Sequence, residues 1–128
     1  MLAEVKKLPD EPIVLVTLPK GYDLKANLSQ SIPGYLRLLE TFDTPVFWIV
    51  DASAVDMKVD ELMIGATLVA RGEHPLYHHP KIRQVIYVTS SELMKAAAAG
   101  MQDEVFGQVN IKLFDNVQDA LSYARSSR

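Results

Sequence analysis

The residues whose types could do chemistry are polar side chains that directly follow apolar segments of the chain. Asp51 and Ser53 come after the segment 46–50, and Thr89 and Ser90 come after the segment 82–88. The carboxyl ends of parallel strands meet at one edge of an open α/β sheet, and ligands commonly bind there. We call these four residues the strand-end cluster. The same edge is expected to collect Ser91, Asp115 and Asn116.

An enzymatic site at this edge lacks the partners that such chemistry needs. A phosphoacceptor aspartate requires a magnesium ion held by further carboxylates, and a lysine that neutralises the phosphoryl group. The segment ending Thr17-Leu18-Pro19 supplies no acid pair, and Asp115 stands where the lysine would be. The chain has no cysteine, no G-x-S-x-G elbow and no glycine-rich phosphate loop. We therefore interpret these polar residues as turn and helix-cap residues, and we expect no enzyme activity.

The histidines of the chain stand together in the segment GEHPLYHHP, as His74, His78 and His79. Imidazoles four residues apart can share a metal ion on a helix, but Pro75 and Pro80 disfavour a helix here. We therefore treat the three histidines as weak metal candidates, and we expect neither a resident metal nor a cofactor.

The elements that must position these residues alternate between strand and helix. Strands are predicted at Leu2 to Leu8, Ile13 to Leu18, Val46 to Val50, Ile82 to Val88 and Ile111 to Phe114. Helices are predicted over 24–42, 60–71, 89–101 and 117–124. The first of them has two candidate starts, one near Ser31 just before Pro33 and one at Leu24, with a break at the proline. The order β-β-α-β-α-β-α-β-α predicts an α/β fold, with a mostly parallel sheet of about five strands, an N-terminal hairpin at its edge and about four helices.

Local sequence also predicts how two of these helices begin. Thr89 and Glu92 have the T-x-x-E spacing of a capping box, and Asp115-Asn116 is expected to cap the last helix. The alanines before Gly100 predict a flat face that can approach the sheet closely. Trp48 lies inside an apolar strand and is expected in the core, whereas the five tyrosines do not cluster in sequence.

The predicted second helix carries more apolar residues than one contact with a sheet requires. One explanation is burial against both the sheet and a neighbouring helix. If part of the helix is exposed instead, it would form a surface for a protein partner, a second copy of the chain or an acyl chain. The candidate surface comprises Met57, Asp60, Met63, Ile64 and Leu68.

The chain resembles the STAS-like fold of bacterial anti-sigma-factor antagonists and the related SpoIIAA-like family. The resemblance rests on VDASAVD at residues 50–56 and on VTSSELMKAAAAGM and KLFDNVQDALSYA further along. It implies a regulatory serine at the start of the second helix, near Val59, Asp60 or Glu61. No hydroxyl residue occurs between Ala54 and Ala66, so we expect the serine switch to be absent. Asp60 could replace it as a constant negative charge, but we favour a role in capping the helix.

Length and composition limit the remaining classes of function. The 128 residues fit a single domain over 1–128, and the net charge of −3 argues against nucleic-acid binding. Without cysteine there is no disulfide framework, which suits a reducing cytoplasm, and no leader or transmembrane segment is indicated. Our first hypothesis is a bacterial, non-enzymatic STAS-like module that binds a protein partner or forms a homodimer. The alternative is a small carrier that holds an apolar or lipid ligand between helices.

Overall fold

The centre of the protein is a five-stranded sheet with the strand order β1-β2-β3-β4-β5. The computed structural model describes residues 3–55, 58, 60–61, 63–64, 76–101 and 111–126. The strands are β1 (Glu4–Lys7), β2 (Ile13–Thr17), β3 (Val46–Asp51), β4 (Ile82–Val88) and β5 (Ile111–Phe114). Each strand lies within the segment that the sequence predicted or extends it by one residue.

The pairing of the strands confirms a mostly parallel sheet with a hairpin at its edge. β1 pairs antiparallel with β2, and all other neighbours pair in parallel. The hairpin turn is closed by a hydrogen bond from the Leu8 backbone N–H to the Ile13 carbonyl, 3.1 Å. Asp10 within this turn has a φ of 59°, a left-handed conformation that aspartate tolerates better than most residues.

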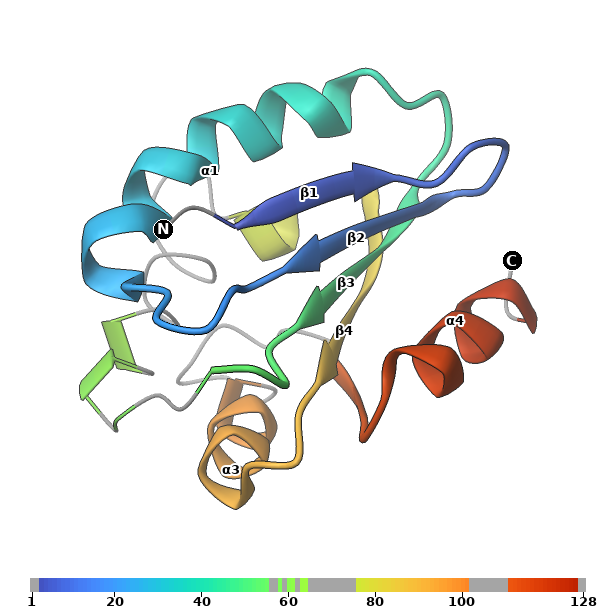
Figure 1. Cartoon of the computed structure of the whole chain (residues 1–128). Helices are drawn as coiled ribbons and strands as arrows, with labels where there is room; N and C mark the ends of the chain where they lie inside the picture. The colour runs from blue at the N-terminus through green and yellow to red at the C-terminus, as the bar shows by residue number, and fades with distance from the viewer. Residues whose placement is uncertain are drawn as a thin grey trace.

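Three α-helices lie in the described part of the chain, one fewer than the sequence predicted (Figure 1). They are α1 (Leu24–Glu40), α3 (Glu92–Met101) and α4 (Val117–Ser126), together with the short 3-10 helix η1 (Leu76–His78). Most of the predicted helix 60–71 falls outside the described residues, although residues 60, 61, 63 and 64 are helical. None of the described helices is long and apolar enough to cross a membrane.

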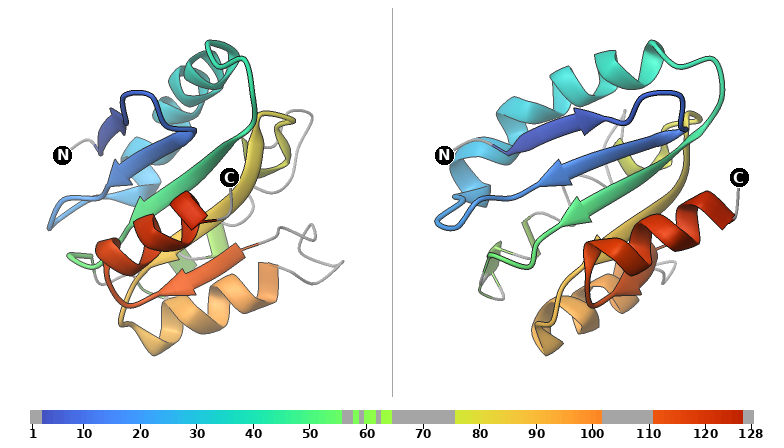
Figure 2. Two further views of the ribbon diagram at one scale, coloured as in Figure 1. Left: turned by 90° about the vertical axis from the view of Figure 1, so that its right-hand side faces the viewer. Right: turned by 45° about the vertical axis from the view of Figure 1, so that its right-hand side comes forward.

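The helices cover the two faces of the sheet unequally (Figure 2). Successive parallel strands are neighbours in the sheet, so right-handed crossovers place α1, η1 and α3 on one face. The helix α4 follows the last strand and packs on the other face, where Ala120 and Ala124 are fully buried. Small side chains at these two positions let α4 approach the sheet closely.

The apolar runs of β2 and β3 are buried on both faces, as the sequence predicted for central parallel strands. Trp48 points to the α1 face and is buried, as expected, with its ring 5.2 Å from the Tyr35 ring in an edge-to-face contact. Phe47 points to the opposite face and meets Tyr123 of α4, with ring centroids 6.2 Å apart. Aromatic contacts thus tie one helix to each face of β3.

Candidate functional site

The strand-end cluster occupies one edge of the sheet, but its first half forms a turn closed on itself. Asp51 lies at the end of β3, and its Oδ1 accepts hydrogen bonds from the backbone N–H of Ser53, 3.1 Å, and from the Ser53 hydroxyl, 2.6 Å. This is an Asx turn, in which an aspartate side chain stabilises the chain as it leaves a strand. The Asp51 oxygen is therefore engaged in local structure.

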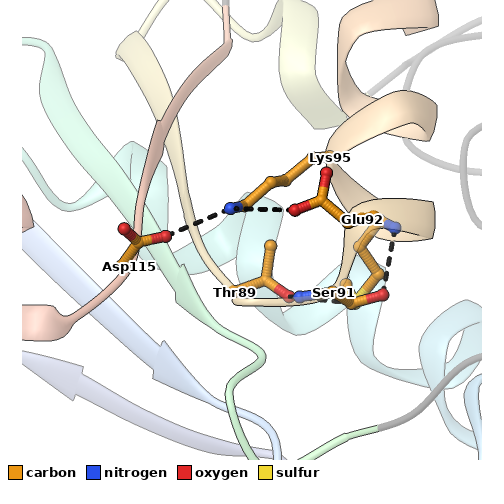
Figure 3. Close-up of polar contacts among 6 residues, drawn as sticks. Thr89, Ser91, Glu92, Lys95 and Asp115 are labelled. Carbon is orange, nitrogen blue, oxygen red and sulfur yellow. Dashed lines mark hydrogen bonds and ion pairs between the residues drawn. The ribbon is translucent and has the colours of Figure 1, made fainter.

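The second half of the cluster organises the start of α3 (Figure 3). Thr89 is 1% exposed, and its Oγ1 accepts a hydrogen bond from the Ser91 backbone N–H, 3.0 Å. The Ser91 Oγ accepts from the Met94 backbone N–H, 3.3 Å, which makes Ser91 the residue that caps the helix. The predicted capping box from Thr89 to Glu92 is wrong, because α3 begins at Glu92 and its cap stands two residues later than expected.

A lysine that we did not predict for this edge reaches it from α3 (Figure 3). Lys95 Nζ lies 3.2 Å from Asp115 Oδ1 and 3.7 Å from Glu92 Oε1. The hydrogen bond to Asp115 and its negative charge raise the pKa of Lys95. The ammonium group thus remains charged and is neutralised by two exposed carboxylates. Because the pair is exposed to solvent, it contributes little to stability.

The sheet register brings both halves of the strand-end cluster to the same edge, as the sequence predicted. Asp51 is opposite Val88, and the Ala52 backbone N–H donates to the Val88 carbonyl, 2.9 Å. Ser90 is exposed at this edge. The side chains of Asp51, Ser53 and Thr89, however, form turns within their own segments. This agrees with the interpretation of these polar residues as turn and helix-cap residues.

Of the three histidine side chains, only that of His79 belongs to the described part of the chain. His79 Nδ1 accepts a hydrogen bond from the Lys81 backbone N–H, 3.0 Å, so one ring nitrogen is used in a turn. His74 and the side chain of His78 lie outside the described residues. Among the residues that the structure describes, no group of three or more histidine, aspartate or glutamate side chains could hold a metal ion.

Three residues of the candidate partner surface are exposed. Met63 is 61% exposed and Ile64 is 40% exposed, and both are helical. Asp60 is also exposed and helical, whereas Met57 and Leu68 lie outside the described residues.

The first turn of this helical segment resembles half of a capping box. The Lys58 backbone N–H donates to Glu61 Oε1, 3.3 Å, as a glutamate in the first turn of a helix commonly accepts. Asp60 stands in the same turn, where an acid complements the helix dipole.

The structure adds Leu93 of α3, 40% exposed, to the exposed apolar side chains. The alanines of α3 predict that this helix packs on the sheet, but only Met94 and Ala98 of its described side chains are buried. The spacing of Leu93 from these two residues places it on another side of the helix, a pattern that could have revealed its exposure.

Four tyrosines that are scattered in sequence gather on the α1 face of the sheet. The Tyr77 and Tyr87 hydroxyls are hydrogen-bonded, 2.7 Å apart, and Tyr22 and Tyr35 pack in the same core cluster. Burial raises the pKa of Tyr22 to about 12, with Tyr35 and Asp23 adding to the effect, and burial raises that of Tyr87 to about 12. We call these four residues the tyrosine cluster; sequence spacing alone could not reveal it.

A shallow hollow of about 570 Å³ lies at the opposite end of the sheet, where β3 and β4 begin. Arg83 is the only charged residue in its lining, and its guanidinium group lies 5.0 Å from the centre of the Phe47 ring. A lone arginine among prolines offers no acid–base pair for catalysis. The lining consists of Pro12, Thr44, Pro45, Pro80, Ile82 and Arg83.

Comparisons with known proteins identify the fold. No model of a known protein family matches the chain, and no curated protein matches it in sequence. A solved structure from Shewanella loihica PV-4 is similar, with a TM-score of 0.55 and 17% sequence identity. The match covers 95% of this chain and 91% of the other, which is described as an uncharacterized protein of the DUF3478 family with a SpoIIAA-like fold.

The protein therefore has the SpoIIAA-like fold that the sequence resemblance implied. In this chain the fold is of the α/β class and is built on a five-stranded, mostly parallel sheet. At 17% identity the similarity concerns the arrangement of the chain and does not extend to a shared activity.

Proposed function

We propose that this protein is a non-enzymatic STAS-like module that acts through contacts with a protein partner or a second copy of itself. The observation that carries the proposal is the exposure of Met63 and Ile64 on the helical segment after β3. Large apolar side chains exposed on neighbouring helical positions are typical of interaction surfaces. Methionine adapts to partners of different shape, because its side chain is unbranched and polarizable.

The use of the strand-end cluster supports a module without catalysis. The oxygens of Asp51, Thr89 and Ser91 accept local backbone hydrogen bonds, and Lys95 is paired with two carboxylates. A catalytic group must instead be available to a substrate. The absence of serine and threonine between Ala54 and Ala66 in the sequence supports a module without the phosphorylation switch.

The test replaces the exposed apolar side chains by a charge. Light scattering at rising protein concentration should show that the parent self-associates and that the double variant Met63→Glu/Ile64→Glu does not. Val5→Glu is the matched control, because Val5 is a similarly exposed apolar residue on β1. If the parent is monomeric, the same variants should be compared in partner capture. The proposal is wrong if neither association nor capture differs between parent and double variant while Val5→Glu behaves as the parent.

A carrier of an apolar ligand is the second candidate function, and one observation favours it. The Tyr22 hydroxyl is buried, and no described residue forms a hydrogen bond with it. A buried hydroxyl without a partner is unfavourable, so it marks a place where a ligand atom could bind. Native mass spectrometry of freshly purified protein should then show a mass excess from retained ligand, and a clean apo mass would count against carriage.

A further inference from the structure

The hollow at the end of the sheet where β3 and β4 begin combines apolar walls with one charged group. Its volume of about 570 Å³ is within the range of small-molecule sites, although it is shallow. Its walls come from three segments: the hairpin between β1 and β2, the connection before β3, and the start of β4. Arg83 and Thr44 are the polar residues of the lining, and the other four residues are apolar.

Main-chain hydrogen bonds hold the three lining segments together. The Phe47 N–H donates to the Pro12 carbonyl, 2.8 Å, and the Val46 N–H donates to the Lys81 carbonyl, 2.7 Å. The proline rings add stiffness, because they fix the backbone angle φ. The walls are therefore in place before a ligand arrives, so little ordering of the chain opposes binding.

A break in the strand register determines where Arg83 points. Val46 of β3 is opposite Ile82 of β4, but the next residue of β3, Phe47, is opposite Gln84. Arg83 is thus an extra residue in β4. Such a β-bulge is rare between parallel strands, and a bulge redirects the side chain of the extra residue.

The side chains next to the bulge show its effect. Ile86 packs on the α4 face of the sheet, and strict alternation along β4 would place Ile82 there as well. Ile82 packs on the α1 face instead. The Arg83 guanidinium lies over the ring of Phe47, a residue of the α4 face, 5.0 Å from the ring centre. The bulge therefore turns Arg83 to the face opposite to the one that alternation predicts.

The positive charge of Arg83 is not balanced by a neighbouring acid. No carboxylate of a described residue forms an ion pair with Arg83. Glu11, which precedes Pro12, is instead held by Nε and Nη2 of Arg125, at 2.8 and 3.2 Å. Lys81 Nζ donates to the Asp43 carbonyl, 3.1 Å, so these two residues place opposite charges beside the hollow.

The charge and the walls together favour one chemical class of ligand. A guanidinium group can donate two parallel hydrogen bonds to a carboxylate and balances its single charge. A phosphate group carries about two negative charges, and one of them would have no partner in the lining. The prolines favour an apolar body on the ligand, because they offer no backbone N–H donor.

We propose that this hollow binds a small apolar carboxylic acid in its ionised form, with the carboxylate paired to Arg83 and the apolar body packed on Pro12, Pro45 and Pro80. The hollow includes no residue of the candidate partner surface or of the strand-end cluster. The inference therefore goes beyond the proposed function, and failure of either one leaves the other standing.

The test titrates phenylacetate into the isotope-labelled full chain and follows the amide signals by NMR. We expect the signals of Thr44, Ile82 and Arg83 to shift, with a Kd on the order of 1 mM, because a shallow site covers only part of a ligand. Arg83→Gln should weaken the affinity about three- to tenfold, since it removes the charge that pairs with the carboxylate. Arg83→Lys should be intermediate, because it keeps the charge and loses the planar fork.

Lys112→Gln is the matched control. Lys112 is also a cation above an aromatic ring, with its Nζ 5.7 Å from the centre of the Tyr123 ring, but it does not line the hollow. This variant should bind phenylacetate like the parent, and an equal loss in both variants would mean non-specific attraction of an anion and would overturn the proposal. Because Arg83 is exposed, Arg83→Gln should keep the amide spectrum of the parent away from the hollow.

A neutral ligand tests the role of the charge without changing the protein. Phenylacetamide has the shape of phenylacetate but no charge, so it should bind the parent more weakly and should not discriminate between parent and Arg83→Gln. Equal binding of the amide and the acid would overturn the proposal. So would an absence of shifts around the hollow, or a phenylacetate affinity that is the same in parent and Arg83→Gln.

Discussion

Short polar side chains at the strand ends of this protein stabilise the backbone, and Asn116 is the clearest example. Its Oδ1 accepts a hydrogen bond from the Asp119 backbone N–H, 2.8 Å, and its Nδ2 donates to Asp119 Oδ2, 3.1 Å. Asn116→Ala should lower the free energy of unfolding by about 1 kcal/mol, because the first turn of α4 loses its cap. Urea denaturation followed by circular dichroism measures the change. Asp115→Ala is the control and should cost less, since it removes only an exposed pair with Lys95; equal losses would contradict the capping role.

The sequence predicted the roles of residues whose hydrogen-bond partners are near in the chain. It missed contacts between residues that are distant in the chain. The cap at Asn116 was correct, because capping depends on the next three residues. The cap at Thr89 was wrong, because Ser91 offers a competing hydroxyl two residues later and the T-x-x-E pattern could not distinguish them. The contact of Tyr77 with Tyr87 depends on how η1 packs against β4, which no local pattern encodes.

At the scale of elements, the strands were predictable because each is an apolar segment bounded by turn residues. The segment 82–88 and the segment 111–114 have the bounds that the structure gives for β4 and β5.

For α1 the sequence left two starts open, one near Ser31 and one at Leu24. The helix begins at Leu24 and continues through Pro33, because packing of its apolar stripe against the sheet outweighs the cost of the proline. In α3 the alanines before Gly100 predicted a flat face for close packing on the sheet. Gly100 itself does not serve such packing, since a Cβ there would meet nothing within 4 Å.

The interior of α1 offers a test of whether its glycine serves packing. Gly34 is exposed, and a Cβ added there would meet nothing within 4 Å. Gly34→Ala should therefore raise the free energy of unfolding by about 0.5–1 kcal/mol, because alanine restricts the unfolded chain and favours a helix. Gly21→Ala is the opposite control, since Gly21 has a φ of 84°, and it should destabilise. Urea denaturation of both variants gives the comparison, and a loss of stability in Gly34→Ala would show that α1 needs a glycine there.

At the scale of the whole molecule, the two faces of the sheet carry core clusters that differ in polarity. On the face covered by α4 the buried residues are aliphatic or phenylalanine, with Tyr123 at the margin bonded to Gln84. The face covered by α1, η1 and α3 holds the tyrosine cluster among its apolar residues. Phenolic hydroxyls are tolerated in such a core only while they remain protonated, because a buried phenolate has lost its hydration. The stability of the whole domain should therefore depend on pH in the alkaline range.

The sign of this dependence follows from the tyrosine pKa values. Burial raises the pKa of Tyr22 and of Tyr87 from 10.0 to about 12, so between pH 10 and 12 the folded protein binds more protons than the unfolded chain. The stability is fully present below pH 10 and falls as the pH rises toward 12. Urea denaturation at pH 8, 10 and 11 should show the decline, and absorbance at 295 nm should show the buried tyrosines ionising together with unfolding. Tyr22→Phe should flatten the decline, because it removes one of the shifted groups; a parent stability that is equal at pH 8 and 11 would mean that the tyrosine cluster is open to solvent.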